Sequence, residues 1–530
     1  MSIRFHNTLT DKVEEFEPLE PGVVRIYTCG PTVYDYAHIG NYRTFVFQDI
    51  LRRHLEYRGY KMLHVMNLTD VDDNTIRNSR AAGVALRDYA EKFIQAFQVD
   101  RQLLGLEDPE IVVRATDCID DMVKLIQTLM EKGYAYTNEG SVYFKVAAFK
   151  DYGKLTKIDL SGILDGARVD ADKYGKENVR DFALWKAAKE GEPFWETPIG
   201  PGRPGWHIEC SAMAMKYLGE TLDIHSGGSD LIFPHHENEI AQSEAATGKP
   251  FARYWIHSAH LMVNGEKMSK SLGNFFTLRD LIAKGCKPTA IRYLLASVHF
   301  RKPLNFTFDG LHQAQQAIGR LRNFRYRLQE DSFPEGGNQE LQKRAAFALE
   351  AVERSLDDNL NTAEALGAVF SMVHDGNMAM DRGEFRDQDR VAFLETLSRW
   401  DRIFSVLEDT DYERLRRFGL RVQVDRVAPL RSQPVLPREA AIAASGSPTM
   451  EPSAAGAVAV SEGAGKASND AATAVLVETL SDAEIEKRVE ERDAARRARD
   501  FARADRIRTE LLESGVILQD SKAGTRWKRK

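Results

Sequence analysis

Residues 23–41 read VVRIYTCGPTVYDYAHIGN, and this stretch joins a strand pattern to the beginning of a helix. The apolar run Val23–Cys29 predicts a buried strand, and apolar residues then recur at helical spacing from about Tyr42 to Tyr57. A second strand is predicted at Met62–Met66, and it ends at Asn67-Leu-Thr-Asp70. This order forms one unit of a parallel α/β sheet, whose functional residues are expected at the carboxyl ends of the strands.

The predicted helix over 42–57 has one apolar side. The residues on that side are Phe45, Ile50, Leu51 and Leu55. Arg52 and Arg53 fall on the remaining surface, so we expect this pair to point mostly into solvent.

The rest of the chain divides into parts that differ in their sequence pattern. The α/β pattern returns at Leu222–His225 and Tyr254–His257, so the irregular stretch before it is interpreted as an insertion into the nucleotide-binding fold. Apolar residues at three- and four-residue spacing then predict a helical bundle. Its predicted helices are Leu311–Gln329, Gln339–Ser355 and Ala363–Met380. The predicted boundaries are 1–114 for the first half of the nucleotide-binding catalytic domain, 115–200 for the insertion, 201–310 for the second half, 311–410 for the bundle, 411–480 for a low-complexity linker and 481–530 for a basic end module.

Two segments near the end of the chain differ sharply in composition. Residues 437–475 are rich in Ala, Gly, Ser and Pro and contain no aromatic residue, which predicts a flexible linker or a disordered insert. Residues 481–530 carry 14 Lys/Arg against 11 Asp/Glu, in a chain whose formal net charge is −7. A capping box at Ser481-Asp-Ala-Glu484 predicts a helix start, Gly515 predicts its end, and Val516–Leu518 predicts a short strand.

The bulk composition excludes several classes of protein. The chain has 530 residues, of which 43% are hydrophobic and 28% charged. It lacks the ~18 consecutive apolar residues of a membrane helix, so no membrane association is expected. The acidic residues near its beginning do not fit a secretory signal or a transit peptide, which predicts a cytoplasmic protein. Four cysteines do not make a disulfide scaffold at this length, so we expect them to be reduced.

A first candidate nucleotide-binding segment follows the strand Val23–Cys29. Residues 30–41 end at a helix start, where unpaired backbone N–H groups and the helix dipole favour a polyphosphate. Gly40 leaves room for a ligand, and His38 and Asn41 can donate hydrogen bonds to charge that develops on phosphate. By themselves, these residues also fit a tight turn with a satisfied histidine.

A second candidate segment reads EKMSKSLGN over 266–274. Lys267 and Lys270 lie three residues apart among small and hydroxylated neighbours, so the loop can close on phosphate groups and stabilise their charge. A solvated loop with two lysines is the alternative for this segment considered alone.

A third group of residues has side chains suited to a metal ion. Cys29 ends the first strand, and both it and Cys210 can supply thiolates. His235 and Glu239 are four residues apart after Pro234, which marks a helix start, so both are expected on one helical face. On residue types alone, buried cysteines and a polar helix start remain an alternative. The His-Glu-x-x-His arrangement of a metalloprotease is absent.

Several blocks together resemble class I aminoacyl-tRNA synthetases, and among these the cysteinyl-tRNA synthetase family of bacterial type. The Lys-Met-Ser-Lys-Ser signature of the class is complete at Lys267–Ser271, whereas His-Ile-Gly-His is matched at His38–Asn41 with Asn41 in place of the last histidine. The family-specific blocks are YTCGPTVY at 27–34, PGWHIECSAM at 204–213 and HSGGSDLIFPHHENE at 225–239. Gly524–Trp527 resembles the end of the family's sequence, and the likeness lapses over roughly 411–475.

The resemblance implies a Rossmann-like parallel-sheet catalytic domain with an insertion, followed by a helical bundle and a small C-terminal tRNA-binding module. It implies an ATP-dependent ligase that joins L-cysteine to tRNA(Cys) through cysteinyl-adenylate, with Mg²⁺ accompanying ATP and a monomeric state. It also implies one Zn²⁺ per chain, which selects the thiolate of the substrate. The implied zinc ligands are Cys29, Cys210, His235 and Glu239.

The resemblance also assigns residues to the two small substrates. ATP is expected to contact His38, Gly40, Asn41, Gly227, Gly228, Lys267, Ser269 and Lys270, of which His38, Asn41, Lys267 and Lys270 are the expected catalytic residues. Trp206 is expected to close over cysteine, and Thr69 and Asp230 to orient its amino and carboxylate groups. Asn41 keeps a hydrogen-bond donor but cannot become cationic, so only hydrogen bonding is expected of it.

Two alternatives remain open at this point. One is a cysteine ligase of the same ancestry that joins cysteine to a small amine and has no need of residues 481–530. The other is a zinc-organised RNA-binding protein without catalysis, against which the complete Lys267–Ser271 segment counts.

Overall fold

A computed structural model describes residues 2–157, 180–269, 272–420 and, except for 499, 501–502, 505–506, 509, 512–515 and 522–523, residues 482–529. The chain forms two compact units, 1–431 and 432–530. Among the described helices, none is both long and apolar enough to cross a membrane.

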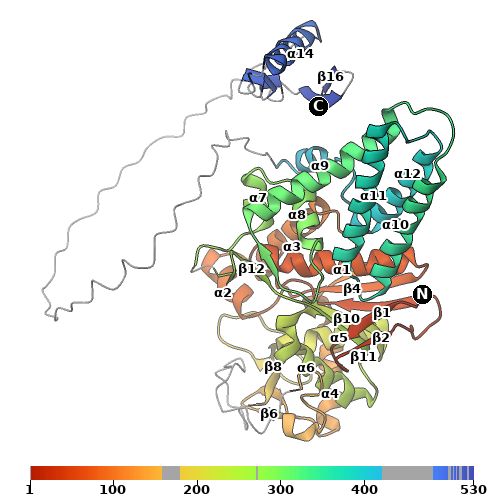
Figure 1. Ribbon diagram of the computed structural model, residues 1–530. Helices are drawn as coiled ribbons and strands as arrows, with labels where there is room; N and C mark the ends of the chain where they lie inside the picture. Colours follow the sequence, from red (N-terminus) through yellow and green to blue (C-terminus); the bar gives the residue numbers. More distant parts are fainter. Residues whose placement is uncertain are drawn as a thin grey trace, which may run out of the picture. The chain divides into compact units, whose positions relative to one another are not determined.

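The centre of the first unit is a five-stranded parallel sheet in the order β11-β10-β3-β4-β5 (Figure 1). Its strands are β3 (Val23–Thr28), β4 (Lys61–Leu68), β5 (Ile111–Arg114), β10 (Leu222–Gly228) and β11 (Ala252–Ser258). The chain runs from the central β3 to β4 and β5 on one side, and later to β10 and β11 on the other. Such a reversal of strand order opens a crevice at the carboxyl ends of β3 and β10. The predicted strands and the predicted parallel α/β sheet are confirmed.

The period of two along β3 sorts its side chains between two cores. Val24 and Ile26 pack with Phe47 and Leu51 of helix α1 (Ile39–Tyr57) on one face of the sheet. Tyr27 points to the other face and belongs to the core formed there with helices α5 (Trp206–Leu218) and α6 (Glu237–Thr247). The sheet is therefore buried on both faces, and functional residues collect at its edge.

The predicted exposure of Arg52 and Arg53 on α1 is wrong. The Arg52 side chain is only 9% exposed, and its guanidinium pairs with both carboxylate oxygens of Glu110 at 2.6 and 2.9 Å. Arg53 forms an ion pair with Asp49 at 2.8 Å and another with Glu107 at 2.8 Å. Helical periodicity cannot reveal these partners, because Glu107 and Glu110 come from the loop that precedes β5 and covers this side of the helix.

The insertion between β5 and β10 forms an additional layer that shares its core with helices α5 and α6. It contains α4 (Ile119–Glu131) and an antiparallel sheet in the order β6-β7-β8-β9. The strands are β6 (Ala135–Asn138), β7 (Ser141–Phe144), β8 (Phe182–Ala187) and β9 (Gly202–Pro204).

The predicted helices of the bundle are confirmed (Figure 1). They are α9 (Phe308–Glu330), α10 (Gln339–Asp357) and α11 (Thr362–Arg382), and the structure adds a fourth helix that was not predicted, α12 (Asp389–Phe404). Helix α13 (Asp411–Arg417) lies in the range predicted as linker, but Asp411 accepts hydrogen bonds from the backbone and hydroxyl of Thr289, so this beginning of the range belongs to the packed unit. The remainder of that range, 421–480, lies outside the described residues.

The first unit contains further described elements. They are β1 (Arg4–Asn7), β2 (Lys12–Glu15), α2 (Asp73–Ala82), α3 (Leu86–Leu103), β12 (Leu261–Val263), β13 (Glu266–Lys267), α7 (Leu278–Ala283), α8 (Pro288–Ala296), β14 (Leu304–Phe306), three single 3₁₀ turns (Ala115–Cys118, Val146–Ala148 and Ser229–Leu231) and the wide turn Ile232–His236.

The second unit contains helix α14 (Asp482–Arg497) and a hairpin of β15 (Val516–Ser521) and β16 (Gly524–Arg529). Its small core joins Ile485 and Leu511 to Val516 and Leu518, with Trp527 packed against them. The predicted strand is confirmed, whereas the proposed cap Ser481 and the proposed stop Gly515 lie outside the described residues.

Candidate active site and metal centre

The four predicted metal ligands meet in the crevice at the end of β3. Their ligand atoms all lie within 4.8 Å of one another, and all four residues are buried. Cys29 follows β3, Cys210 lies on α5, and His235 and Glu239 flank the start of α6, with 3.0 Å between His235 Nε2 and Glu239 Oε1. His235 lies in the wide helical turn Ile232–His236, which runs directly into α6, so it lies one turn before Glu239, as the four-residue spacing predicted. Two sulfur donors, an imidazole and a carboxylate at these distances fit a metal site.

Two further histidines lie in the same cluster and were missed by the sequence prediction. His225, from β10, lies with its Nε2 2.8 Å from Glu239 Oε2, and His236 Nε2 is 3.3 Å from Cys29 Sγ. Cys29, His225, His236 and Glu239 form a second set of donor atoms within 4.8 Å of one another. The family-like block at 225–239 contains both histidines, so the signal was present, but nothing in their spacing connected them to Cys29.

The side chains of the cluster differ in the direction in which their pKa is shifted. Burial raises the pKa of the Cys29 thiol well above its usual range. Burial acts in the same direction on Cys210, but the hydrogen bond with Cys29 and the neighbouring His235 lower its pKa to about 6. Burial is also outweighed at His235, where Glu239 and Cys210 raise the pKa to about 10. A divalent cation bound by these side chains would displace the protons that they hold in its absence.

Of the predicted cysteine-binding residues, Trp206 contacts the metal cluster directly. Trp206, at the first turn of α5, stacks on His235 with 4.1 Å between the ring centroids. Thr69 follows β4 and is buried, and its hydroxyl donates a hydrogen bond to Glu209 Oε2 at 2.9 Å. Asp230 is exposed and lies in the turn after β10. Burial, followed by the negative charge of Cys210, raises the pKa of Glu209 well above its usual range.

The segment His38–Asn41 forms the N-terminal cap of α1. The Asn41 backbone N–H donates to His38 Nδ1 at 3.1 Å, and the His38 backbone N–H donates to Asn41 Oδ1 at 3.0 Å. Because Nδ1 accepts, the proton of a neutral His38 imidazole resides on Nε2. Because Asn41 Oδ1 also accepts, the amide NH₂ is the end of that side chain left to donate to a ligand.

The loop that contains Lys267 contacts this cap directly. The Ile39 backbone N–H donates to the Phe276 carbonyl at 2.9 Å. A Cβ atom at Gly40 would lie 3.1 Å from the Met268 methyl, so the two segments touch at a point where only glycine fits easily. Lys267 is exposed at the end of β13, whereas Lys270 and Ser271 lie outside the described residues.

Asn274 holds the two sides of this loop together. Its side chain accepts from the Ser269 backbone N–H at 2.7 Å and donates to the Lys267 carbonyl at 3.2 Å. It follows the signature Lys267–Ser271 closely in the sequence, but its bracing role could not be deduced from residue type.

Gly227 and Gly228, at the end of β10, have close neighbours in the protein itself. A Cβ at position 227 would lie 2.8 Å from the His236 ring, and one at position 228 would lie 2.3 Å from Asp230 Oδ1. Packing therefore favours a small residue at position 227, whereas the close neighbour of position 228 is the end of the exposed Asp230 side chain, which can move.

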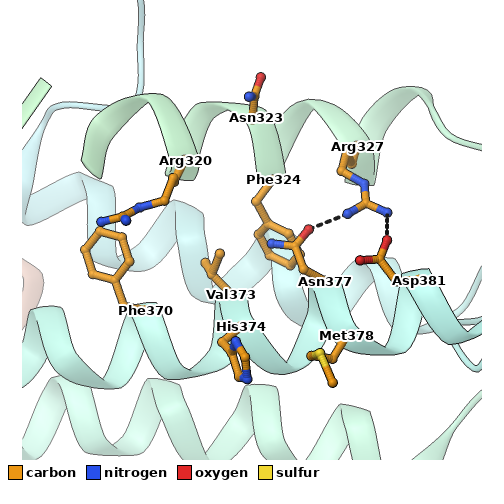
Figure 2. A pocket seen from close by; sticks show the side chains of 10 residues that line it. All are labelled: Arg320, Asn323, Phe324, Arg327, Phe370, Val373, His374, Asn377, Met378 and Asp381. Carbon is orange, nitrogen blue, oxygen red and sulfur yellow. Dashed lines mark hydrogen bonds and ion pairs between the residues drawn. The ribbon is translucent and has the colours of Figure 1, made fainter. Parts of the chain in front are cut away.

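A separate groove of about 720 Å³ runs between α9 and α11 (Figure 2). Arg327 spans it, donating to Asn377 at 2.6 Å and pairing with Asp381 at 3.1 Å, while the Arg320 guanidinium stacks over Phe370. The groove contains none of the residues predicted for ATP, cysteine or metal.

Comparisons with known proteins identify the family of the chain. The family described as tRNA synthetases class I (C) catalytic domain matches residues 15–316, and the DALR domain matches residues 351–408. The cysteine–tRNA ligases of Solibacter usitatus (strain Ellin6076) and Koribacter versatilis (strain Ellin345) are 52% identical over 530 residues and 50% identical over 532 residues, each covering 100% of both chains. Among solved structures, the Mycobacterium tuberculosis methionyl-tRNA synthetase in complex with methionyl-adenylate matches the fold with a TM-score of 0.55 at 16% identity, covering 75% of this chain and 94% of that chain. The chain therefore belongs to the cysteine–tRNA ligase family of class I aminoacyl-tRNA synthetases.

Proposed function

We propose that the chain activates L-cysteine with ATP and transfers it to tRNA(Cys). The observation that carries this proposal is the cluster of Cys29, Cys210, His235 and Glu239, within a chain that matches cysteine–tRNA ligases along its whole length. The sulfur donors suit a metal ion that can in turn bind the thiol of cysteine. The segment after Cys29 leads to the capped start of α1, where phosphate binding is favoured.

The metal of this site is zinc, one ion per chain. Two thiolates, an imidazole and a carboxylate match the ligands and the four-fold coordination that zinc prefers. When bound, zinc supplies a Lewis acid that favours a thiolate over a hydroxyl group. His225 and His236 then act as neighbours that orient Glu239 and Cys29 through their hydrogen bonds.

Activation proceeds by attack of the cysteine carboxylate on the α-phosphorus of ATP, with departure of pyrophosphate. His38 Nε2–H and the Asn41 amide donate to phosphate oxygens, and Lys267 and Lys270 neutralise charge on the leaving group. Gly40, Gly227, Gly228 and Ser269 complete the ATP contacts, and Mg²⁺ accompanies the nucleotide. The protein thus contributes position and charge rather than a covalent step.

Cysteine is held beside the metal site by three further residues. Trp206 covers it, Thr69 accepts a hydrogen bond from its ammonium group, and Asp230 orients its polar atoms at the mouth of the crevice. The 2′-OH of the terminal tRNA ribose then attacks the mixed anhydride, which releases AMP.

The tRNA is bound by the helical part, 311–410, and by the basic module, 481–530. Arg320 and Asn323, exposed on α9 at the groove in Figure 2, are candidates for phosphate contacts. We expect a monomer in the cytoplasm, where charged tRNA is consumed.

The two alternatives receive less support. A ligase of cysteine to a small amine has no need of residues 481–530, yet the full-length relatives extend through them. A non-catalytic RNA-binding protein needs no complete Lys267–Ser271 segment.

The test is cysteine-dependent exchange of pyrophosphate into ATP, followed by charging of tRNA(Cys). We expect both activities, and we expect serine to support exchange about 10⁴-fold less well because its hydroxyl is a poor ligand for zinc. Exchange without charging of any tRNA would favour the small-amine ligase, and absence of exchange would favour the binding protein.

A further inference from the structure

A chain of buried polar groups runs beside the metal cluster and ends in a carboxylate. The Gly30 backbone N–H donates to Asn67 Oδ1 at 2.8 Å, and Asn67 Nδ2 donates to Thr69 Oγ1 at 3.2 Å. The Thr69 hydroxyl in turn donates to Glu209 Oε2 at 2.9 Å. Asn67 and Thr69 are each 1% exposed and Glu209 is fully buried, so water cannot take part freely in this chain.

The far end of the chain is unsatisfied. Glu209 Oε1 has no hydrogen-bond partner, and in the part of the chain that the structure describes no lysine or arginine forms an ion pair with Glu209. A buried carboxylate oxygen of this kind is costly unless a cation or a hydrogen-bond donor reaches it. The fold therefore maintains an acceptor here that the described residues do not use.

The hydrogen bonds also fix what Thr69 can offer to a ligand. Its proton is donated to Glu209 and one lone pair accepts from Asn67, so the lone pair that remains can only accept. An accepting hydroxyl next to a carboxylate is complementary to an ammonium group and unsuited to a second carboxylate.

The position of this pair relative to the metal cluster agrees with the shape of cysteine. Glu209 precedes Cys210 on α5 and Gly30 follows Cys29, so each end of the polar chain is bonded in the backbone to a residue that carries a sulfur ligand. In cysteine, the ammonium nitrogen is only three bonds from the sulfur atom.

We propose that Glu209 is a positioning residue for the α-ammonium group of cysteine. Through its hydrogen bond it holds Thr69 as an acceptor. Burial without a cation partner raises the pKa of Glu209, and an ammonium group bound beside Oε1 would supply that partner and favour the ionised carboxylate. This inference rests on the proposed binding of cysteine in the crevice, and it adds Glu209 and Asn67 to the residues that define the amino end of the substrate.

The test compares three thiols in the full-length, zinc-loaded protein. Cysteamine keeps the ammonium and thiol groups of cysteine, whereas 3-mercaptopropionate lacks the ammonium group. In Glu209→Gln, we expect the KM for cysteine and the inhibition constant of cysteamine to rise about 10- to 100-fold, as for loss of a charged hydrogen-bond partner, while inhibition by 3-mercaptopropionate changes by less than about twofold. Zinc content, measured by mass spectrometry, should stay at one ion per chain.

A second pair of variants protects the test against misfolding of Glu209→Gln. Thr69→Val removes the hydroxyl at nearly constant volume and should weaken the two ammonium-containing thiols selectively, whereas Thr69→Ser should restore them. Equal weakening of all three thiols, loss of zinc in every variant, or no weakening at all would overturn the proposal. Failure of the proposed function is distinguishable, because the unchanged protein would then show no cysteine-dependent pyrophosphate exchange.

Discussion

The two ends of the candidate active site are built in opposite ways. At the metal end, Cys29, Cys210, His235 and Glu239 come from three segments, none is more than 7% exposed, and each contacts another member of the cluster. At the nucleotide end, His38 and Asn41 are half-buried at a helix cap, and Lys267 is exposed on a short strand.

This contrast indicates that the metal end determines which ligand is bound and that the nucleotide end determines the rate of the reaction. The buried end is packed into the core beneath the sheet edge, so it can select a ligand without rearrangement. The exposed end depends on contacts between two segments, such as Ile39 with Phe276, and its charges act when phosphate is present. We therefore expect changes at the metal end to alter what is bound, and changes at the nucleotide end to alter how fast it reacts.

The largest effect is expected from Cys210→Ala. Loss of a sulfur ligand should remove zinc and lower cysteine-dependent pyrophosphate exchange by at least about 10³-fold, because metal and ligand site depend on each other. Metal content and exchange are measured together. Cys118→Ala is the matched control, since Cys118 is equally buried but lies outside the donor cluster. Full activity of metal-free Cys210→Ala would end the zinc proposal.

The next effect tests the nucleotide end through Lys270→Ala. Removal of a charge that neutralises pyrophosphate should lower kcat about 10²-fold while the KM for cysteine changes little. Steady-state exchange kinetics give both values, and the exposed Lys284, near the end of α7, provides Lys284→Ala as a control. A change in the KM for cysteine alone would show that the two ends are not separable.

A smaller effect is expected from a deletion that leaves both ends of the site intact. Deletion of residues 481–530 is expected to raise the KM for tRNA about 10- to 100-fold through loss of phosphate contacts, with pyrophosphate exchange nearly unchanged. Deletion of 440–470, whose composition does not favour a packed core, is the control and should change neither activity. Equal loss of exchange and charging after the first deletion would indicate a structural role for the module.

The smallest effect separates capping from catalysis at Asn41. Asn41→Asp keeps an acceptor for the His38 N–H but replaces the amide donor with negative charge, so we expect unchanged thermal stability and kcat lowered about tenfold. Asn41→Ala loses both functions and should also be destabilised by about 1 kcal/mol. Thermal unfolding and exchange kinetics distinguish the two variants. Equal kcat values for Asn41→Asp and the unchanged protein would remove Asn41 from the phosphate site.

Local patterns predicted the elements well because the information for them is local. The strand at Val23–Cys29 and the helices of the bundle follow from apolar spacing, and the short signature segments mark where the strands end. The meeting of Cys29 with His235 and Glu239 required the family resemblance, since residue type alone left buried cysteines as an alternative.

Contacts between distant segments could not be predicted in this way. The sequence gives no sign that Glu107 and Glu110 cover Arg52, so an arginine on the polar side of a helix was expected in solvent. Glu209 stands inside a recognised block, yet its hydrogen bond with Thr69 depends on how α5 packs against the end of β4. Such pairs are set by tertiary packing rather than by periodicity.

Because position 40 lies against Met268 and His38, the effect of a substitution at position 40 depends on the residues at those two positions. A methyl group at position 40 would lie 3.1 Å from the Met268 methyl and 2.9 Å from His38 Nδ1, so a neighbour would have to give way. Met268 is flexible and can be shortened, whereas His38 caps α1 and has little freedom. A small residue at position 268 therefore relieves only one of these contacts, because the His38 ring still lies against position 40. The same histidine that caps α1 thus keeps position 40 closed to larger residues, so the cap would have to change before this position could vary.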